Sequence, residues 1–415
     1  MRFRFIHAAD LHLDSPLLGL SARSPEVAAR IADASRQAFD NLIALCLDER
    51  CRLMVIAGDV FDGDWRDWRT GQFFVSRMLR LREAGVRVVM ILGNHDATNG
   101  FMSRLELSDN VTLLSSRRPE TKRFDDIGAA VHGLSFPRRE VTENVALGYP
   151  APLPGLFNIG LLHTAATGRE GHVSYAPCTV EQLANHGYQY WALGHIHARE
   201  VLCASPPILF SGNLQGRSVR ETGAKGATLV EVEGGEVLRF EHRPLDVARF
   251  ETRTLALDGV ETRDALMEAV RLCAESALDA AEGRALALRL ALAGRTPLHG
   301  ELAAGFALLR EEVETLFAAL SSDLWLEKLA LRTEPPAAPA SAPGVDPSVA
   351  GGLREAIAEL CADGWLDARL EERLAKIRPK LPPHAHAEAF LAAARLDAPA
   401  RARALALALV EEGQG

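Results

Sequence analysis

The chain has 415 residues, 48% of them hydrophobic, with 46 Lys and Arg against 55 Asp and Glu and a formal net charge of −9. This composition is typical of a globular protein with a sizeable core, and the length predicts two or three domains. No run approaches the ~20 apolar residues of a membrane-spanning helix, and the N-terminal segment lacks the apolar stretch of a signal peptide. We therefore expect a cytoplasmic protein with no membrane attachment.

The net negative charge is concentrated in the C-terminal part of the chain. Residues 1–250 carry 28 Lys and Arg and 29 Asp and Glu, a net charge of −1, so the remaining residues carry −8. The overall balance, taken alone, argues against a polyanion such as DNA as a partner. Because the first 250 residues are almost neutral, that argument does not apply to them.

The cysteines are scattered and include no CxxC pair, which favours reduced core residues over a disulfide framework or a zinc cluster. They are Cys46, Cys51, Cys178, Cys203, Cys273 and Cys361.

In the first 250 residues, short apolar runs alternate with longer amphipathic stretches, which predicts an α/β domain over residues 1–245. We expect strands at 3–8, 53–57, 86–92, 129–134, 157–162 and 188–193, a helix within 64–84, and a β-rich closing section at 207–210, 227–232 and 237–241.

A second unit is expected at residues 246–334. Strand-like runs at 250–257, 285–293 and 324–331 are separated by helix-like stretches at 261–281 and 298–320. This β-α-β-α-β order predicts a small α/β module. The segment PPAAPASAPGVDP then indicates an extended linker at 335–349. Residues 350–415 are expected to form a helical tail that folds against the body or against another protein.

Five polar clusters lie directly after predicted strands or at their ends. Because the carboxyl ends of the strands in an open α/β sheet share one edge, these clusters could meet in space. Asp, Asn and neutral His suit Mn²⁺, Fe or Zn²⁺, and seven such donors suit two ions that share a carboxylate. The clusters are Asp10-Leu-His12, Gly58-Asp59-Val-Phe-Asp62, Gly93-Asn94-His95-Asp96, His163 and Gly194-His195-Ile-His197.

The series DLH, GDVFD, GNHD, LLHT and GHIH resembles, in order and complete, the signature of the calcineurin-like metallophosphoesterases. The segments FIHAADLHLDSPL and FSGNLQGRSVRETGAKG resemble the DNA-repair exonuclease branch, which includes SbcD-type nuclease subunits and YhaO-like proteins. The resemblance implies an α/β (α+β) fold: a four-layer β-sandwich flanked by helices, followed by a small α/β capping domain and a helical C-terminal tail.

The resemblance also implies a role for each polar side chain. Two divalent cations are expected, with Mn²⁺ first and Fe²⁺ or Zn²⁺ as alternatives; they would polarise the phosphate and lower the pKa of a bound water. One ion would be held by Asp10, His12 and His197, the other by Asn94, His163 and His195, with Asp59 between them. His95 would be the general acid or would stabilise the transition state, Asp96 would orient it, and Asp62 would lie near the site in a less defined role.

Further contacts are expected in the loop that follows the last motif. Asn213, Gln215, Arg217 and Arg220 would bind the phosphodiester. Trp65 and Trp68 could stack on a base, although packing along a helix is the favoured interpretation. His384 and His386 have a metal-like spacing without a further ligand, and we expect them to be ordinary surface residues.

The leading functional hypothesis is a metal-dependent DNA exonuclease acting in DNA repair. Its helical tail would dock an SbcC-like coiled-coil ATPase, and a homodimer is left open. One alternative is a phosphoesterase acting on small phosphodiesters, cyclic nucleotides or phosphoproteins, because these enzymes share the same ligand spacing. A second alternative is a non-catalytic scaffold with the same fold.

Overall fold

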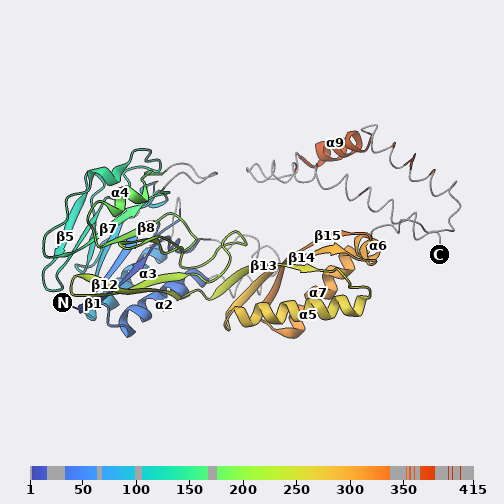
Figure 1. Ribbon diagram of the computed structural model, residues 1–415, viewed down its shortest axis with the longest axis horizontal. Helices are drawn as coiled ribbons and strands as arrows, with labels where there is room; N and C mark the ends of the chain where they lie inside the picture. Colours follow the sequence, from blue (N-terminus) through green and yellow to red (C-terminus); the bar gives the residue numbers. More distant parts are fainter. Residues whose placement is uncertain are drawn as a thin grey trace. The chain divides into compact units, whose positions relative to one another are not determined.

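The structure of the chain is a computed structural model, shown in Figure 1. It describes residues 2–15, 33–62, 68–98, 105–166, 175–336 and 365–378, with isolated positions between 352 and 402. The chain divides into unit 1, Met1–Thr252 with Ala277–Ala287, and unit 2, Arg253–Ser276 with Leu288–Gly415. Within the described ranges, no helix combines the length and the apolar character needed to cross a lipid bilayer.

Unit 1 contains two six-stranded sheets. The first has the order β12-β11-β1-β2-β3-β4, in which β1 to β4 are parallel and β11 and β12 are antiparallel to their neighbours. All five residues of β2 are buried, as expected for a parallel strand that is covered on both faces. The strands are β1 (Arg2–Ala8), β2 (Leu53–Ala57), β3 (Arg87–Ile91), β4 (Val111–Leu113), β11 (Gly226–Glu233) and β12 (Glu236–Pro244).

The second sheet has the order β5-β6-β7-β8-β10-β9. Its four central strands are parallel, and the two edge strands pair antiparallel with their neighbours. The strands are β5 (Glu120–Phe124), β6 (Ala129–Gly133), β7 (Phe157–His163), β8 (Tyr190–Gly194), β9 (Glu200–Ala204) and β10 (Pro207–Phe210).

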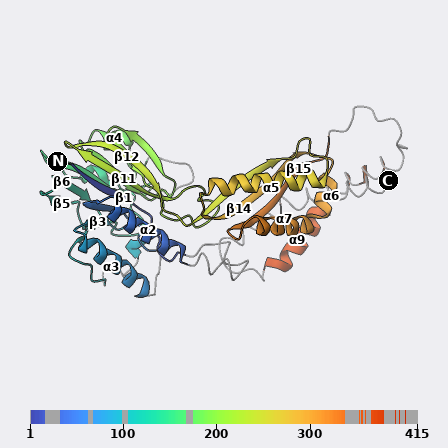
Figure 2. The same ribbon diagram turned by 90° about the horizontal axis from the view of Figure 1, so that it is seen from below.

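One hydrophobic cluster joins the two sheets, with Phe5 and Val55 from the first packed together with Ile159 and Tyr190 from the second. Helices α2 (Ala34–Asp48) and α3 (Trp68–Glu83) cover the other face of the first sheet (Figure 2). Helix α4 (Val180–Ala184) packs on the outer face of the second. Two short 3₁₀ helices, η1 (Asp96–Thr98) and η3 (Val145–Gly148), lie in connecting loops. The prediction of α/β sheets flanked by helices is therefore confirmed.

The remaining elements form a smaller α/β module. Its sheet has the order β13-β14-β15, and buried leucines alternate along β14 at Leu286, Leu288, Leu290 and Leu292. The elements are β13 (Ala248–Ala256), α5 (Arg263–Ala280), β14 (Ala285–Arg295), α6 (His299–Ala304), α7 (Phe306–Leu320) and β15 (Leu324–Glu334). In the tail, α9 spans Trp365–Ile377. The linker beyond residue 336 lies outside the described residues, and the domain limits at 245, 334 and 349 remain predictions.

Candidate metal centre and active site

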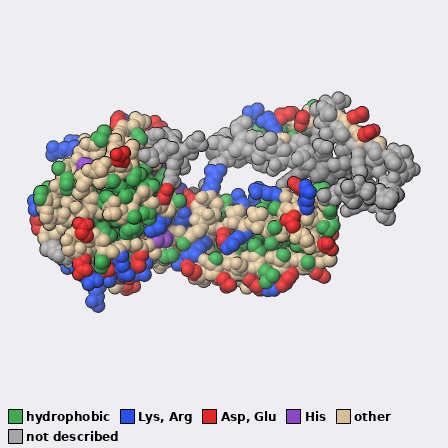
Figure 3. Space-filling model, in the orientation of Figure 1, with side chains coloured by type: hydrophobic (Ala, Val, Ile, Leu, Met, Phe, Trp, Pro, Cys, Tyr) green, Lys and Arg blue, Asp and Glu red, His purple; other side chains and the backbone are tan. Residues whose placement is uncertain are grey.

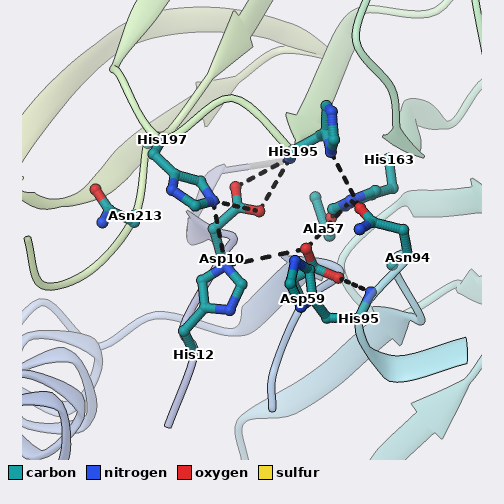
Figure 4. A network of polar contacts seen from close by, with 12 residues as sticks. Asp10, His12, Ala57, Asp59, Asn94, His95, His163, His195, His197 and Asn213 are labelled. Carbon is teal, nitrogen blue, oxygen red and sulfur yellow. Dashed lines mark hydrogen bonds and ion pairs between the residues drawn. The ribbon is translucent and has the colours of Figure 1, made fainter. Parts of the chain in front are cut away.

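The candidate site lies where the carboxyl ends of strands from both sheets meet (Figure 4). β1, β2 and β3 lead into the loops with Asp10, Asp59 and Asn94, while His163 ends β7 and Gly194 ends β8. The structure thus brings together all seven side chains that the sequence indicated as cation ligands: Asp10, His12, Asp59, Asn94, His163, His195 and His197.

The loops hold several of these residues in a backbone conformation that L-amino acids rarely adopt. The φ angles of Asp10, Asp59 and His195 are 51°, 53° and 99°. Backbone hydrogen bonds fix the loops, because the Asp10 amide donates to the Gly58 carbonyl (3.0 Å) and the His12 amide donates to the Asp59 carbonyl (3.1 Å). Such strain persists only where the surroundings enforce it, and it is concentrated at functional sites.

Asp10, His12 and His197 form the first group of donors. The Nε2 atoms of His12 and His197 lie 3.2 Å apart, and His197 Nε2 is 3.9 Å from Asp10 Oδ1. Two nitrogens that bind one cation at about 2.1 Å have a separation of about this size. The Asp10 carboxylate also accepts from the His195 amide, at 3.1 and 3.0 Å, which fixes its orientation.

Asn94, His163 and His195 form the second group. Asn94 Oδ1 lies 2.9 Å from His163 Nε2 and 3.1 Å from His195 Nδ1. Burial lowers the pKa of His163 to about 3, and its Nδ1 donates to the Ala57 carbonyl at 2.9 Å. The Nε2 lone pair of a neutral His163 therefore faces the amide oxygen of Asn94. Two acceptor atoms that face each other in this way repel. A cation bound by both would remove the repulsion, so the group fits a metal site.

Asp59 lies between the two groups. Its Oδ1 accepts from the His95 amide at 2.9 Å, while its Oδ2 is 3.9 Å from His12 Nε2 and 3.5 Å from His163 Nε2. Gly93 is required beside it, because a Cβ at that position would lie only 2.2 Å from Asp59 Oδ1. One carboxylate oxygen thus faces both groups of donors.

The electrostatics of the cluster also favour bound cations. Burial and the neighbouring Asp59 charge raise the pKa of Asp10 well above its usual value, and burial raises the pKa of Asp59 to about 6. Burial lowers the pKa of His12, and its Nδ1 has no hydrogen-bond partner. Buried carboxylates beside neutral imidazoles need positive charge, which divalent cations would supply.

The expected role of Asp96 is wrong, and Asp62 takes its place. Asp96 is buried and accepts hydrogen bonds from the backbone amides of Val60 (3.1 Å), Phe61 (3.0 Å) and Gly93 (3.2 Å), so it joins two loops. The His95 ring instead contacts Asp62, with Nδ1 2.8 Å from Oδ1. That hydrogen bond lowers the pKa of Asp62 to about 2 and raises the pKa of His95.

Two of the four expected substrate contacts have structural roles instead. Gln215 is buried and bonds to the backbone of residue 248, donating to its carbonyl at 2.6 Å and accepting from its amide at 3.3 Å. Asn213 is buried, and its amide donates to the Gln215 carbonyl and to Glu221. Arg220 is exposed. Arg217 lies at the site, because its guanidinium is 3.4 Å from Asp62 and 3.0 Å from Glu221.

Glu221 was missed by the sequence analysis. Its Oε1 lies 2.7 Å from Nδ1 of the candidate ligand His197, and its side chain is 13% exposed. Burial raises the pKa of Glu221, but hydrogen bonds with His197 and Arg217 outweigh burial and bring the pKa below its usual range. The available signal was a carboxylate four residues after Arg217, in the loop that follows the last motif.

Other expectations have mixed outcomes. Trp68 begins α3 and is 52% exposed, so it is not part of the helix face that packs on the sheet through Phe74 and Met78. Cys46, Cys51, Cys178, Cys203 and Cys273 are free thiols. Trp65, Cys361, His384 and His386 lie outside the described residues.

Two facing sheets with carboxylate, amide and imidazole donors at their strand ends define a domain of the metallophosphoesterase class. Residues 3–199 match the calcineurin-like phosphoesterase family, and residues 250–334 match the middle domain of the metallophosphoesterase YhaO. The N-terminal part of the chain therefore belongs to the calcineurin-like metallophosphoesterases, which confirms the prediction from the motifs.

Individual relatives agree with this assignment. The chain is 40% identical over 247 residues to the uncharacterized metallophosphoesterase YhaO of Bacillus subtilis, covering 59% of this chain and 60% of that protein. It is 26% identical over 268 residues to the DNA double-strand break repair protein Mre11 of Methanopyrus kandleri, covering 57% and 56%. The same-named protein of Sulfurisphaera tokodaii is 25% identical over 248 residues, covering 56% and 60%. The matched region thus spans less than two thirds of each relative.

Proposed function

We propose that this chain is a phosphodiesterase that degrades DNA as an exonuclease and uses two divalent cations, with Mn²⁺ as the first choice. The observation that carries this is the position of Asp59, whose Oδ2 faces one donor group at 3.9 Å and the other at 3.5 Å. Cations bound there would supply Lewis acidity and activate a water molecule for attack on phosphorus. Relatives named as DNA double-strand break repair proteins support DNA as the substrate.

The residues of the chain would divide the remaining work. Asp62 fixes the His95 ring through Nδ1 at 2.8 Å, so that His95 would deliver a proton to the leaving oxygen. The ring centroids of His95 and His12 are 5.0 Å apart, which places His95 beside the first donor group. Arg217, 21% exposed at the rim, would bind a non-bridging phosphate oxygen.

The proposal includes a protein partner. Residues after 250 carry a net charge of −8, and both acidic and basic side chains appear on the face of unit 2 that Figure 3 displays. Such a surface suits a protein better than DNA. Following the resemblance to the exonuclease branch, we place docking of a coiled-coil ATPase at the helical tail, in a cytoplasmic DNA-repair complex that could contain two copies of the chain.

A substrate comparison tests the function. The purified chain with Mn²⁺ is incubated with end-labelled double-stranded DNA, bis-p-nitrophenyl phosphate and p-nitrophenyl phosphate, each with and without EDTA. We expect metal-dependent cleavage of the DNA and the diester, with the label giving the polarity of digestion. Rapid monoester hydrolysis without DNA cleavage would refute the nuclease assignment. Inactivity on all three substrates, without cation binding, would favour the alternative in which the chain is a non-catalytic scaffold.

Truncation separates the partner from the chemistry. A chain that ends at residue 334 should keep Mn²⁺-dependent diester cleavage and lose binding to the coiled-coil ATPase, as measured by co-purification. Loss of cation binding in this variant would instead make the tail part of the nuclease.

A further inference from the structure

A group of charged and polar side chains lies behind the first donor group. His12 and His197 face each other through Nε2 at 3.2 Å, and on the opposite side of each ring Nδ1 faces a carboxylate. Glu221 lies 2.7 Å from His197 Nδ1, whereas Asp62 lies 3.7 Å from His12 Nδ1, too far for a hydrogen bond. Arg217 joins the two carboxylates, at 3.0 Å from Glu221 and 3.4 Å from Asp62.

Among these side chains, Glu221 makes the short contact with a candidate cation ligand, at 2.7 Å from His197 Nδ1. A carboxylate only accepts hydrogen bonds, so the contact requires the proton of the neutral His197 ring to be on Nδ1. The lone pair is then on Nε2, which faces His12 and Asp10. The Arg217 guanidinium lies 3.1 Å from the same Nδ1 and can only donate, so the shorter contact with Glu221, at 2.7 Å, is the one that favours this tautomer and ring orientation.

Glu221 is itself held in place by contacts on both of its oxygens. Its Oε1 faces the Arg217 guanidinium at 3.0 Å, while Oε2 accepts from the Asn213 side chain at 2.9 Å and from the Arg217 amide at 2.8 Å. The side chain is 13% exposed, so water competes little for these contacts. These donors fix the Glu221 carboxylate in one position.

The second donor group is supported differently. His163 donates from Nδ1 to the neutral carbonyl of Ala57, at 2.9 Å, and contacts Asn94 through Nε2. A neutral acceptor makes a weaker, uncharged contact than a carboxylate does. The Nδ1 atom of His197 in the first group therefore faces a charged carboxylate, whereas the Nδ1 atom of His163 in the second group faces a neutral carbonyl.

We propose that Glu221 is a positioning residue for the first cation, acting through His197, and that Arg217 locks it in place. This inference rests on the proposed two-cation function and deepens it, because it makes one of the two cation sites dependent on a side chain that binds neither cation. Removing the charge of Glu221 should weaken the first site and leave the second unchanged.

The test compares cation binding in Glu221→Gln and in a matched control, Glu231→Gln. Glu231 is a carboxylate on β11 with 5% side-chain exposure, paired with Arg2, Arg4 and Arg239 away from the site. Mn²⁺ is titrated by calorimetry, and the electron paramagnetic resonance spectrum is recorded at one and two equivalents. For Glu221→Gln we expect a loss of about 10–100-fold in affinity for one class of site only. At two equivalents its spectrum should show isolated Mn²⁺ where the wild type shows a coupled pair.

Further variants keep the test decisive if Glu221→Gln folds poorly, which melting without cations reveals. Glu221→Asp retains the charge and should recover part of the lost affinity. Arg217→Met removes the lock but not the carboxylate, and should weaken the same class of site to a smaller extent. Unchanged affinities in Glu221→Gln, equal weakening of both sites, or the same loss in Glu231→Gln would overturn the positioning role and leave the proposed function intact. A wild-type chain that binds no Mn²⁺ would overturn both.

Discussion

Unit 1 buries many ionisable side chains, whereas in the described part of unit 2 the buried polar residues are Thr296 and Thr333. The buried side chains of unit 2 otherwise come from apolar residues such as Leu288, Leu309 and Phe317. Among the described residues of unit 1, the buried acidic and basic side chains are His7, Asp10, His12, Asp59, Asp96, His132, His163, Lys225, Glu231, Asp246 and Arg249.

This difference separates what folds the chain from what performs its chemistry. Burial of an ionisable group is unfavourable unless hydrogen bonds or opposite charge compensate. Asp96 has such compensation from three backbone amides. Asp59 accepts from the His95 amide, and Asp10 accepts from the His195 amide. Burial raises the pKa of all three carboxylates, that of Asp96 to about 7 and that of Asp59 to about 6, so it is the smaller number of backbone donors that separates Asp10 and Asp59 from Asp96. We infer that the two carboxylates are retained for cation binding and not for stability.

The largest effect should come from Asp59→Asn. Because Asp59 Oδ2 faces both donor groups, we expect diester turnover to fall at least about 1,000-fold, or about 4 kcal/mol in the activation barrier. The apo variant should melt at the same temperature as the wild type or higher, since a buried charge is removed. Turnover and melting measured on one preparation check both statements. Near-normal turnover would show that Asp59 does not join the two groups.

The next effect separates cation binding from proton transfer. His95→Ala should retain both cations and lose about 100–10,000-fold in turnover, because His95 would supply a proton and is outside the ligand set. Diester hydrolysis and Mn²⁺ stoichiometry provide the two measurements. If the variant loses a cation, His95 is a ligand; if its rate is normal, His95 is not the acid.

A third prediction concerns the apolar interior of unit 2. Leu288→Ala removes a fully buried side chain and should reduce the free energy of unfolding of unit 2 by about 2–5 kcal/mol. Hydrogen exchange resolved along the chain measures this, with faster exchange expected in β14 and unchanged exchange in β2. Leu272→Ala is the control, because Leu272 is 53% exposed on α5 and should change little. Equal effects from both variants would contradict the assignment of the core.

The sequence predicted which candidate ligands lie together better than it predicted their surroundings, for a physical reason. Each candidate ligand lies next to a strand end, so local motif and strand order are sufficient to place it. The partner of His95 was mistaken because Asp62 and Asp96 are both near the site, and the loop fold decides which one reaches the ring. Glu221 is 24 residues from His197 and meets it only through tertiary folding.

The same distinction applies to the secondary structure. Strand β2 was predicted with its observed limits because its run is wholly apolar. Strand β5, with the sequence ETKRF, was not predicted, since it is a polar edge strand whose pairing with β6 determines its conformation. Helix α2 and strands β4 and β9 were also absent from the sequence-based expectations.

The smallest effect is a pH dependence that buried histidine gives to unit 1. His7 is wholly buried, with Nδ1 3.0 Å from the Tyr190 hydroxyl and Nε2 3.1 Å from the Leu193 carbonyl, and burial lowers its pKa from 6.5 to about 3. The folded state therefore favours the neutral ring while the unfolded chain takes up a proton below pH 6.5. The stability from His7 is present above that pH and is lost as the pH falls toward 3.

Between pH 7 and pH 5 this loss should be about 2 kcal/mol. The measurement is the difference in unfolding free energy between the wild type and His7→Gln, in EDTA at both pH values. Glutamine can donate to Leu193 and accept from Tyr190 without titrating, so it keeps the polar contacts and removes the proton equilibrium. Taking the difference cancels the other titrating groups of the cluster, which are the same in both proteins. A difference that does not change with pH would mean that His7 has the same pKa in the folded and unfolded states, and the interior around His7 would then not favour the neutral ring.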